Sequence, residues 1–110
     1  MKLGIIGLGA VGSAVKKGFE YIGHEVYGHD IRTNTNIEDV LQTDIVYVCV
    51  GTPTANDEHC DISAVIDVVG QLSNLNYKGI VAIKSTVKPG TTNQLIDQHK
   101  NLTIAFVPEF

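Results

Sequence analysis

Three glycines spaced as G-x-G-x-x-G lie near the start of the chain, in the sequence GLGAVG of residues 7–12. They follow the apolar run KLGII and open a segment with helical spacing. In such a context Gly7 allows a tight turn, Gly9 lets the backbone approach a pyrophosphate, and Gly12 lets the helix pack close to the strand. The helix N-terminus offers unpaired N–H groups and the positive end of its dipole. The pattern predicts a dinucleotide phosphate site, and the alternative is a glycine-rich turn without a ligand.

An acidic residue, Asp30, follows the second apolar run at the spacing expected for the side chain that binds an adenosine ribose. A carboxylate there accepts hydrogen bonds from the ribose hydroxyls and repels a 2′-phosphate, which favours NAD over NADP. Arg32 is a cation two residues further on and would soften this preference. The alternative is that Asp30 is a solvated turn residue, as an Asp before a loop often is.

Small and polar residues also follow three further apolar runs. The sequence GTPT of residues 51–54 follows the third run, and Thr86 follows the fourth within KSTVKPGTT. Hydroxyl residues followed by Pro or Gly suit backbone turns that pass close under a flat cofactor. On their own they are better explained as turn and cap residues, and Lys84 and Lys88 as solvated cations. Because ligands of open α/β sheets bind outside the carboxyl ends of the strands, Glu109 after the fifth run also points at a site.

Five short apolar runs alternate with segments of helical spacing along the chain. Runs that are apolar on both faces suit buried parallel strands, and the repeated order of strand, helix and strand implies right-handed crossovers. The predicted fold class is therefore α/β, a doubly wound parallel sheet of Rossmann-like type with helices on both faces. Strands are expected at residues 2–6, 25–28, 45–50, 80–84 and 103–107, and helices at 10–22, just after Asn36, at 62–75 with Asp61 as the cap, and at 91–99.

The connection from Asp30 to Ile45 is short and holds little more than the polar stretch IRTNTN and a short helix. A full dinucleotide-binding fold normally places one more strand there. That edge strand is expected to be either vestigial, around residues 33–35, or absent.

Length and composition set the broad class of the protein. The 110 residues, 44% of them hydrophobic, predict one modest core and one domain over residues 1–110. The formal charge of −4, with scattered cations, argues against a nucleic-acid or anionic-membrane surface. No apolar run approaches the ~20 residues that a membrane span needs, which predicts a cytoplasmic location.

The spacing of cysteines and histidines supports neither a disulfide framework nor a metal site. Cys49 and Cys60 lack a C-x-x-C spacing and are expected to be reduced thiols. The histidines form no metal-binding motif and are expected at the surface or in loops: His24, His29, His59 and His99.

Several blocks in this order resemble one enzyme family: GIIGLGAVG, VCVGTPT, CDISAV, IVAIKSTVKPGTT and FVPEF. Together they resemble the N-terminal NAD-binding domain of the UDP-glucose/GDP-mannose dehydrogenase family over nearly the whole chain. Enzymes of this family oxidise the C6 alcohol of a nucleotide sugar to a carboxylate, using two NAD in succession. The combination of STVKPGTT with PEF is much more specific than the glycine pattern alone.

The resemblance implies roles for matching residues. Thr86 would lie near the reacting centre and assist water and proton handling, and Glu109 would be a second polar group there, so both are assigned as catalytic. The implied partners are a nucleotide-sugar substrate and a C-terminal substrate domain, and a homodimer is left open. The residues assigned to NAD binding are Gly7, Gly9, Ala10, Val11, Gly12, Asp30, Val50, Gly51, Thr52 and Thr86.

The chain also departs from the family pattern. Glu58-His59 stands where relatives often carry a glycine before the aspartate, and the segment from Asp30 to Ile45 is shorter than in long members. The family's catalytic cysteine and its lysine, asparagine and aspartate partners fall beyond residue 110. The cysteines of this chain match neither that motif nor its position, so neither is offered as the nucleophile.

Three functional hypotheses follow. The first is the cofactor half of a nucleotide-sugar 6-dehydrogenase, with a substrate half outside these residues. The second is an NAD-dependent dehydrogenase of the 6-phosphogluconate or 3-hydroxyacid type, against which STVKPGTT followed by VPEF argues. The third is a dinucleotide-binding module that performs no chemistry.

Overall fold

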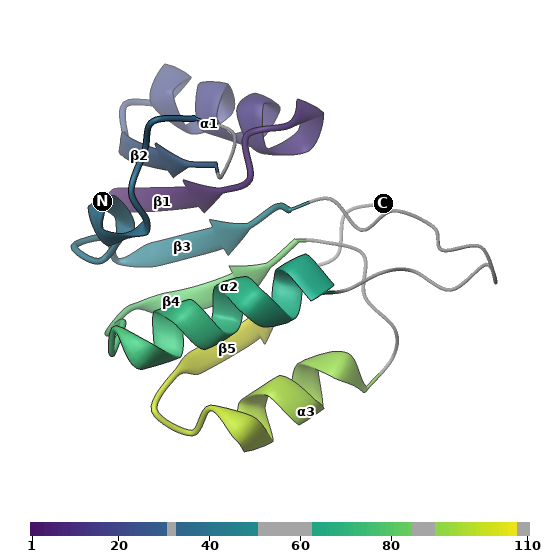
Figure 1. Ribbon diagram of the computed structural model, residues 1–110. Helices are drawn as coiled ribbons and strands as arrows, with labels where there is room; N and C mark the ends of the chain where they lie inside the picture. The colour runs from purple at the N-terminus through teal and green to yellow at the C-terminus, as the bar shows by residue number, and fades with distance from the viewer. Residues whose placement is uncertain (31–32, 51–62, 85–89, 108–110) are drawn as a thin grey trace, which may run out of the picture.

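The computed structural model describes residues 1–30, 33–50, 63–84 and 90–107. Figure 1 shows a single twisted sheet with helices packed against it. In chain order the elements are β1 (Lys2–Ile6), α1 (Ala10–Tyr21), β2 (Glu25–His29), the 3-10 helix η1 (Ile37–Val40), β3 (Ile45–Val48), α2 (Ser63–Asn74), β4 (Ile80–Ile83), α3 (Thr91–Gln98) and β5 (Thr103–Phe106).

The five strands form one parallel sheet in the order β2-β1-β3-β4-β5. The chain starts in β1, the second strand of this order, crosses to the edge strand β2 on one side and then to β3, β4 and β5 on the other. This change of direction confirms the predicted doubly wound topology, and it places the carboxyl ends of β1 and β3 at the switch point where such folds bind ligands. Each predicted strand is found: β1 has the predicted bounds, and the other four end one or two residues from their predicted ends.

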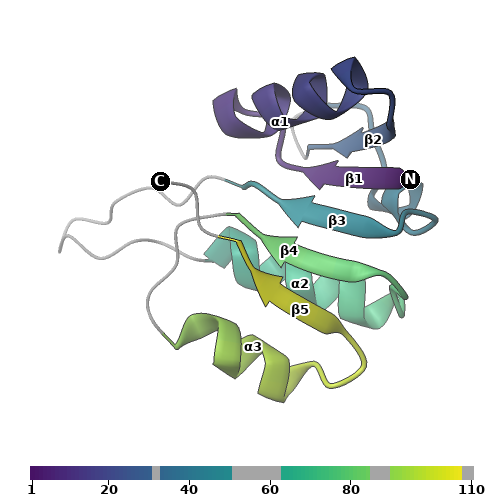
Figure 2. The ribbon, with the colours of Figure 1, turned by 180° about the vertical axis from the view of Figure 1, so that it is seen from behind.

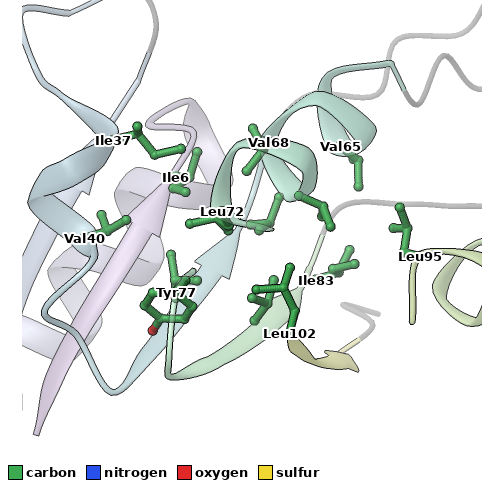
Figure 3. Packing of buried hydrophobic residues seen from close by; sticks show 14 residues of the cluster. Ile6, Ile37, Val40, Val65, Val68, Leu72, Tyr77, Ile83, Leu95 and Leu102 are labelled. Atoms are coloured by element: carbon green, nitrogen blue, oxygen red, sulfur yellow. The ribbon is translucent and has the colours of Figure 1, made fainter. Parts of the chain in front are cut away.

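Helices cover both faces of the sheet, as predicted, but unequally. One face carries η1, α2 and α3 and contains the aliphatic core shown in Figure 3. Tyr77, which leads into β4, is also buried there. On the other face α1 packs over β1 and β2, and Phe19 of α1 contacts Tyr47 of β3 with ring centroids 5.3 Å apart. Figure 2 shows that no described helix lies over β4 and β5 on this side.

The region after β2 contains no strand among residues 33–44, which include the 33–35 stretch where a vestigial edge strand was one expectation. The 3-10 helix η1 occupies this connection instead, and its Ile37 and Val40 are buried against the sheet. Gly4 of β1 makes room for it, because a Cβ there would lie 3.0 Å from the Cβ of Val40. A short helix therefore covers the sheet where a longer chain would add a strand.

Strand β5 differs from the expectation that the run TIAFV is buried. Only Ile104 of this strand is half-buried, the other residues are exposed, and 43% of Phe106 is accessible. The physical reason is position: β5 is an edge strand of the described sheet, and no helix among the described residues covers one of its faces. An apolar sequence pattern indicates that a strand is present, but it does not indicate which other elements cover that strand.

None of the helices in the described ranges is long and apolar enough to cross a membrane.

Candidate dinucleotide-binding site

The glycine loop after β1 is built by close backbone contact. Gly7 has φ +96°, a conformation that disfavours other residues, and a Cβ there would lie 2.8 Å from the carbonyl carbon of Cys49 and the nitrogen of Val50. The Gly7 N–H donates to the carbonyl oxygen of His29 at 2.8 Å. Gly7 therefore does more than allow a tight turn. Because it has no Cβ, the loop passes directly against the backbone just after β3, and its N–H bonds to the last residue of β2.

Helix α1 begins immediately over this loop. Gly9 is its N-cap in an extended conformation, and a Cβ on Gly12 would overlap the carbonyl oxygen of Gly7. The hydroxyl of Ser13 donates to the carbonyl oxygen of Leu8 at 2.9 Å and holds the loop to the helix. The first turn of α1 carries no acidic residue, so no carboxylate of that turn competes with an anion for its N–H groups. The glycine loop and the start of α1 together form the predicted phosphate site, which we call the phosphate cradle.

Asp30 is buried beside the loop, with 5% of its surface exposed. Its Oδ2 accepts a hydrogen bond from the backbone N–H of Leu8 at 2.7 Å. The alternative of a solvated turn residue is therefore wrong. A carboxylate can accept about four hydrogen bonds, and the backbone N–H of Leu8 supplies one of those made by Asp30. The structure therefore places the Asp30 carboxylate directly beside the glycine loop.

Hydroxyl groups from residues 33–35 surround the backbone of Asp30, and sequence reasoning missed them. Thr33 donates through its hydroxyl to the carbonyl oxygen of Asp30 at 2.9 Å, and the Asp30 N–H donates to Thr35 Oγ1 at 3.1 Å. Thr35 Oγ1 also lies 2.9 Å from His29 Nδ1. His29 was expected at the surface or in a loop, and that expectation is wrong: it ends β2 and is buried, because the Thr35 hydroxyl satisfies its ring nitrogen.

The structure brings part of the predicted site together at the carboxyl edge of β1, β2 and β3. The glycine loop, the start of α1, Asp30 and Val50 meet there, with Val50 half-buried against the core. The other predicted site residues, and with them Lys88 and Cys60, lie outside the described residues: Gly51, Thr52, Thr86 and Glu109. Cys49 lies at the same edge as a buried thiol.

A shallow apolar hollow lies between α1 and the sheet, on the face that no described helix covers beyond β3. Its volume is about 290 Å³, and its walls include Phe19, Ile22 and Tyr47. Lys84, which was expected to be a solvated cation, is half-buried at its rim. None of its lining residues belongs to the glycine loop of residues 7–12, so the hollow is separate from that loop.

Comparison with known proteins decides the family. Residues 31–110 match the model of the UDP-glucose/GDP-mannose dehydrogenase family, NAD binding domain. The chain belongs to this family. The match begins after Asp30, so the glycine loop and Asp30 lie outside it, and their assignment rests on the geometry described above.

Individual relatives agree with this assignment. A UDP-glucose 6-dehydrogenase of Rickettsia prowazekii is 31% identical over 97 residues, which is 83% of this chain and 22% of the relative. The solved UDP-glucose dehydrogenase of the archaeon Pyrobaculum islandicum is 26% identical with a TM-score of 0.83, covering 99% of this chain and 36% of that one. A UDP-D-ManNAc dehydrogenase of Pyrococcus horikoshii shares the fold at 22% identity and a TM-score of 0.87. The chain thus spans between a fifth and about a third of the length of these proteins.

Proposed function

We propose that this chain is the NAD-binding part of a nucleotide-sugar 6-dehydrogenase, acting as one domain over residues 1–110. The family match to an NAD binding domain supports the cofactor. The observation that carries the proposal is the bond between Leu8 N–H and Asp30 Oδ2, because it joins the predicted phosphate-binding loop to the predicted ribose acceptor. Oxidation of a UDP- or GDP-sugar is the activity that the printed names of the relatives favour.

The described residues fit the adenosine half of NAD. The pyrophosphate would lie against the N–H groups at the start of α1, with Gly9 allowing its close approach. The ribose hydroxyls would donate to the Asp30 carboxylate, which stands at the end of β2 beside the loop. A 2′-phosphate on that ribose would meet the same carboxylate and be repelled, so NAD is the favoured dinucleotide.

When bound, NAD supplies the hydride acceptor for oxidation of the substrate carbon. The chain's own contribution is to hold and orient the cofactor so that this acceptor meets the sugar. Thr86 and Glu109 remain predictions as the catalytic residues at that end. Gly51 and Thr52 remain predictions as residues that line the cofactor path.

On the α1 face of the sheet, the part over β4 and β5 that no described helix covers supports a further domain as partner. Parallel sheets are usually covered on both faces, yet on this side β4 and β5 expose Ile80 and Ala105. The match covers 36% of the Pyrobaculum islandicum protein. We propose that a substrate domain, corresponding to the part of such relatives outside the match, packs against this face. A homodimer and a cytoplasmic location stay predictions.

The experiment that tests the proposed activity follows NADH absorbance with UDP-glucose, GDP-mannose and related sugars. We expect no appreciable turnover by the 110-residue chain, because a sugar held by one wall lacks positioning and the covalent step of this family needs a cysteine from outside these residues. Addition of a C-terminal substrate half, on the same or a separate chain, should restore turnover. In the restored protein, Glu109→Gln should slow turnover without abolishing NAD binding.

Robust NADH production by the 110-residue chain alone would contradict the incomplete-enzyme proposal. If the completed protein produces no NADH with any of the sugars, the hypothesis of a module that binds a dinucleotide without catalysis is favoured. Turnover of a hydroxyacid or of 6-phosphogluconate, but of no nucleotide sugar, would favour the second type of dehydrogenase.

A further inference from the structure

Thr35 is the centre of a hydroxyl cluster behind the cofactor-facing acid. Its Oγ1 lies 2.9 Å from His29 Nδ1, 3.1 Å from the Asp30 nitrogen and 2.8 Å from Thr33 Oγ1. It also lies 3.3 Å from the carbonyl oxygen of Asp30. One half-buried hydroxyl therefore contacts polar groups of three residues at the carboxyl end of β2.

The donors and acceptors of this cluster fit together. The backbone N–H of Asp30 can only donate, so Thr35 Oγ1 accepts from it. The hydroxyl of Thr33 and its backbone N–H both point to the carbonyl oxygen of Asp30, at 2.9 and 3.0 Å. The single proton of Thr35 remains for His29 Nδ1, for Thr33 Oγ1 or for the Asp30 carbonyl oxygen. In every arrangement the N–H and the carbonyl oxygen of Asp30 are both bound.

The opposite side of Asp30 is held by the glycine loop. Its Oδ2 accepts from Leu8 N–H at 2.7 Å, and the neighbouring His29 carbonyl oxygen accepts from Gly7 N–H at 2.8 Å. The backbone of Asp30 is thus fixed by the two threonines, and its carboxylate is fixed by the loop. Such a double constraint pre-organises an acceptor, because little conformational freedom remains to be lost when a ligand binds.

We propose that Thr35 is a positioning residue for cofactor selectivity, which sets the place of the Asp30 carboxylate against the ribose of NAD. The inference rests on the proposed function, and it assigns to Thr35 an effect exerted through Asp30 rather than by contact with the cofactor. Without the hydroxyl, the Asp30 N–H and His29 Nδ1 lose a buried partner, and the end of β2 relaxes away from the loop. A displaced carboxylate binds the ribose less well and repels a 2′-phosphate less strongly, so selectivity for NAD over NADP falls.

The test compares Thr35→Val, which replaces the hydroxyl by a methyl group of similar size, with Thr35→Ser, which keeps it. Thr103→Val is the matched control, because Thr103 is exposed on β5 at the far edge of the sheet. Affinities for NAD and NADP are measured by calorimetric titration. We expect Thr35→Val to weaken NAD binding roughly five- to tenfold, the effect of about one lost hydrogen bond. It should also lower the ratio of NAD affinity to NADP affinity. Thr35→Ser and Thr103→Val should keep the ratio of the unmodified chain.

A second measurement follows the carboxylate directly. The amide of Leu8 should exchange faster with solvent in Thr35→Val, because its acceptor moves, whereas the amide of Cys49, which donates to the Ile6 carbonyl oxygen at 2.8 Å inside the sheet, should not. If Thr35→Val does not fold, Thr33→Val takes its place, since it removes an exposed hydroxyl that bonds to the Asp30 carbonyl oxygen. It should narrow the ratio in the same direction.

Two results separate the inference from the proposed function. Suppose that the unmodified chain prefers NAD and that the variants lacking either hydroxyl keep the same ratio of NAD affinity to NADP affinity. This result overturns the role of Thr35 and leaves the proposed function standing. An unmodified chain that binds neither dinucleotide overturns both. Uniform weakening of NAD and NADP by Thr35→Val, with an unchanged Leu8 amide, also contradicts the inference, because it marks a structural role alone.

Discussion

The two halves of the molecule are held together by different forces. Where the ends of β1 and β2 meet the start of α1, the contacts are close backbone approaches and hydrogen bonds, centred on Gly7, Gly12 and Asp30. Around β3, β4 and α2 an aliphatic cluster fills the space, with Val69 and Leu72 fully buried. The first half forms a polar edge where a side chain in place of Gly7 or Gly12 would collide with the backbone. The second half provides most of the apolar burial. We therefore expect stability and ligand binding to respond to different substitutions.

The largest loss of stability is expected in the aliphatic half. Leu72→Ala should lower the free energy of unfolding by about 2 to 5 kcal/mol, because Leu72 is 0% exposed and its removal leaves a cavity in the core. Leu75→Ala is the matched control, since Leu75 is 37% exposed and should cost much less. Urea unfolding of both variants measures the difference. Equal effects would show that the cluster does not dominate stability.

The next effect is expected where α1 meets the loop. Gly12→Ala should destabilise the fold by about 1 to 3 kcal/mol and weaken NAD binding, because the new Cβ overlaps the carbonyl oxygen of Gly7. Gly18→Ala lies in the same helix with nothing within 4 Å of its Cβ, and should stabilise the helix by about 0.5 to 1 kcal/mol. Thermal unfolding distinguishes the two. If both variants behave alike, helix propensity and not close contact governs Gly12.

A smaller effect appears only at high pH. Burial raises the pKa of Tyr77 above its ordinary value of 10.0, against the lowering effect of its hydrogen bond with Thr43, and Asp44 raises it further. Above pH 10 the unfolded chain then loses this proton before the folded chain does, so stability should fall as the pH rises. Tyr77→Phe should flatten this fall in urea unfolding between pH 8 and about 11. If the free energy of unfolding falls equally with pH in the unmodified chain and in Tyr77→Phe, the burial of a neutral Tyr77 phenol is contradicted.

The smallest change in stability is expected at Gly9, with a large change in binding. Its extended φ of −74° and ψ of −158° suit a residue with a side chain, so Gly9→Val should cost about 1 kcal/mol or less of stability. The side chain should nevertheless obstruct the pyrophosphate and abolish NAD binding. Gly18→Val controls for an added side chain on the same helix, far from the loop. Unchanged NAD affinity in folded Gly9→Val would contradict the proposed site.

Much of the fold could be predicted because its signals are local. Apolar runs of strand length, separated by helical spacing, predict all five strands, and the G-x-G-x-x-G spacing predicts the turn that joins β1 to α1. The roles of Gly7 and Gly12 follow from the absence of a Cβ, which is visible in the sequence. The structure adds what those glycines approach, namely the backbone of β3 and the loop's own carbonyl group.

The unpredicted features depend on contacts between parts of the chain. The exposure of β5 depends on which elements cover an edge strand, and the apolar pattern of the sequence does not give this information. The burial of His29 and the bonds of Thr35 depend on the turn after β2, which brings a hydroxyl back to residues six and five positions earlier. Two threonines separated by one residue, closely following an acidic residue, were the available signal, but the polar stretch was interpreted only as a short connection or a vestigial edge strand.

The most direct test of the central claim is calorimetric titration of the unmodified chain with NAD and with NADP, repeated for Asp30→Ala. The account predicts that NAD binds more tightly than NADP, because the Asp30 carboxylate accepts the ribose hydroxyls and repels a 2′-phosphate. It also predicts that Asp30→Ala weakens NAD binding and narrows the difference between the two dinucleotides. Equal or tighter binding of NADP by the unmodified chain would contradict it.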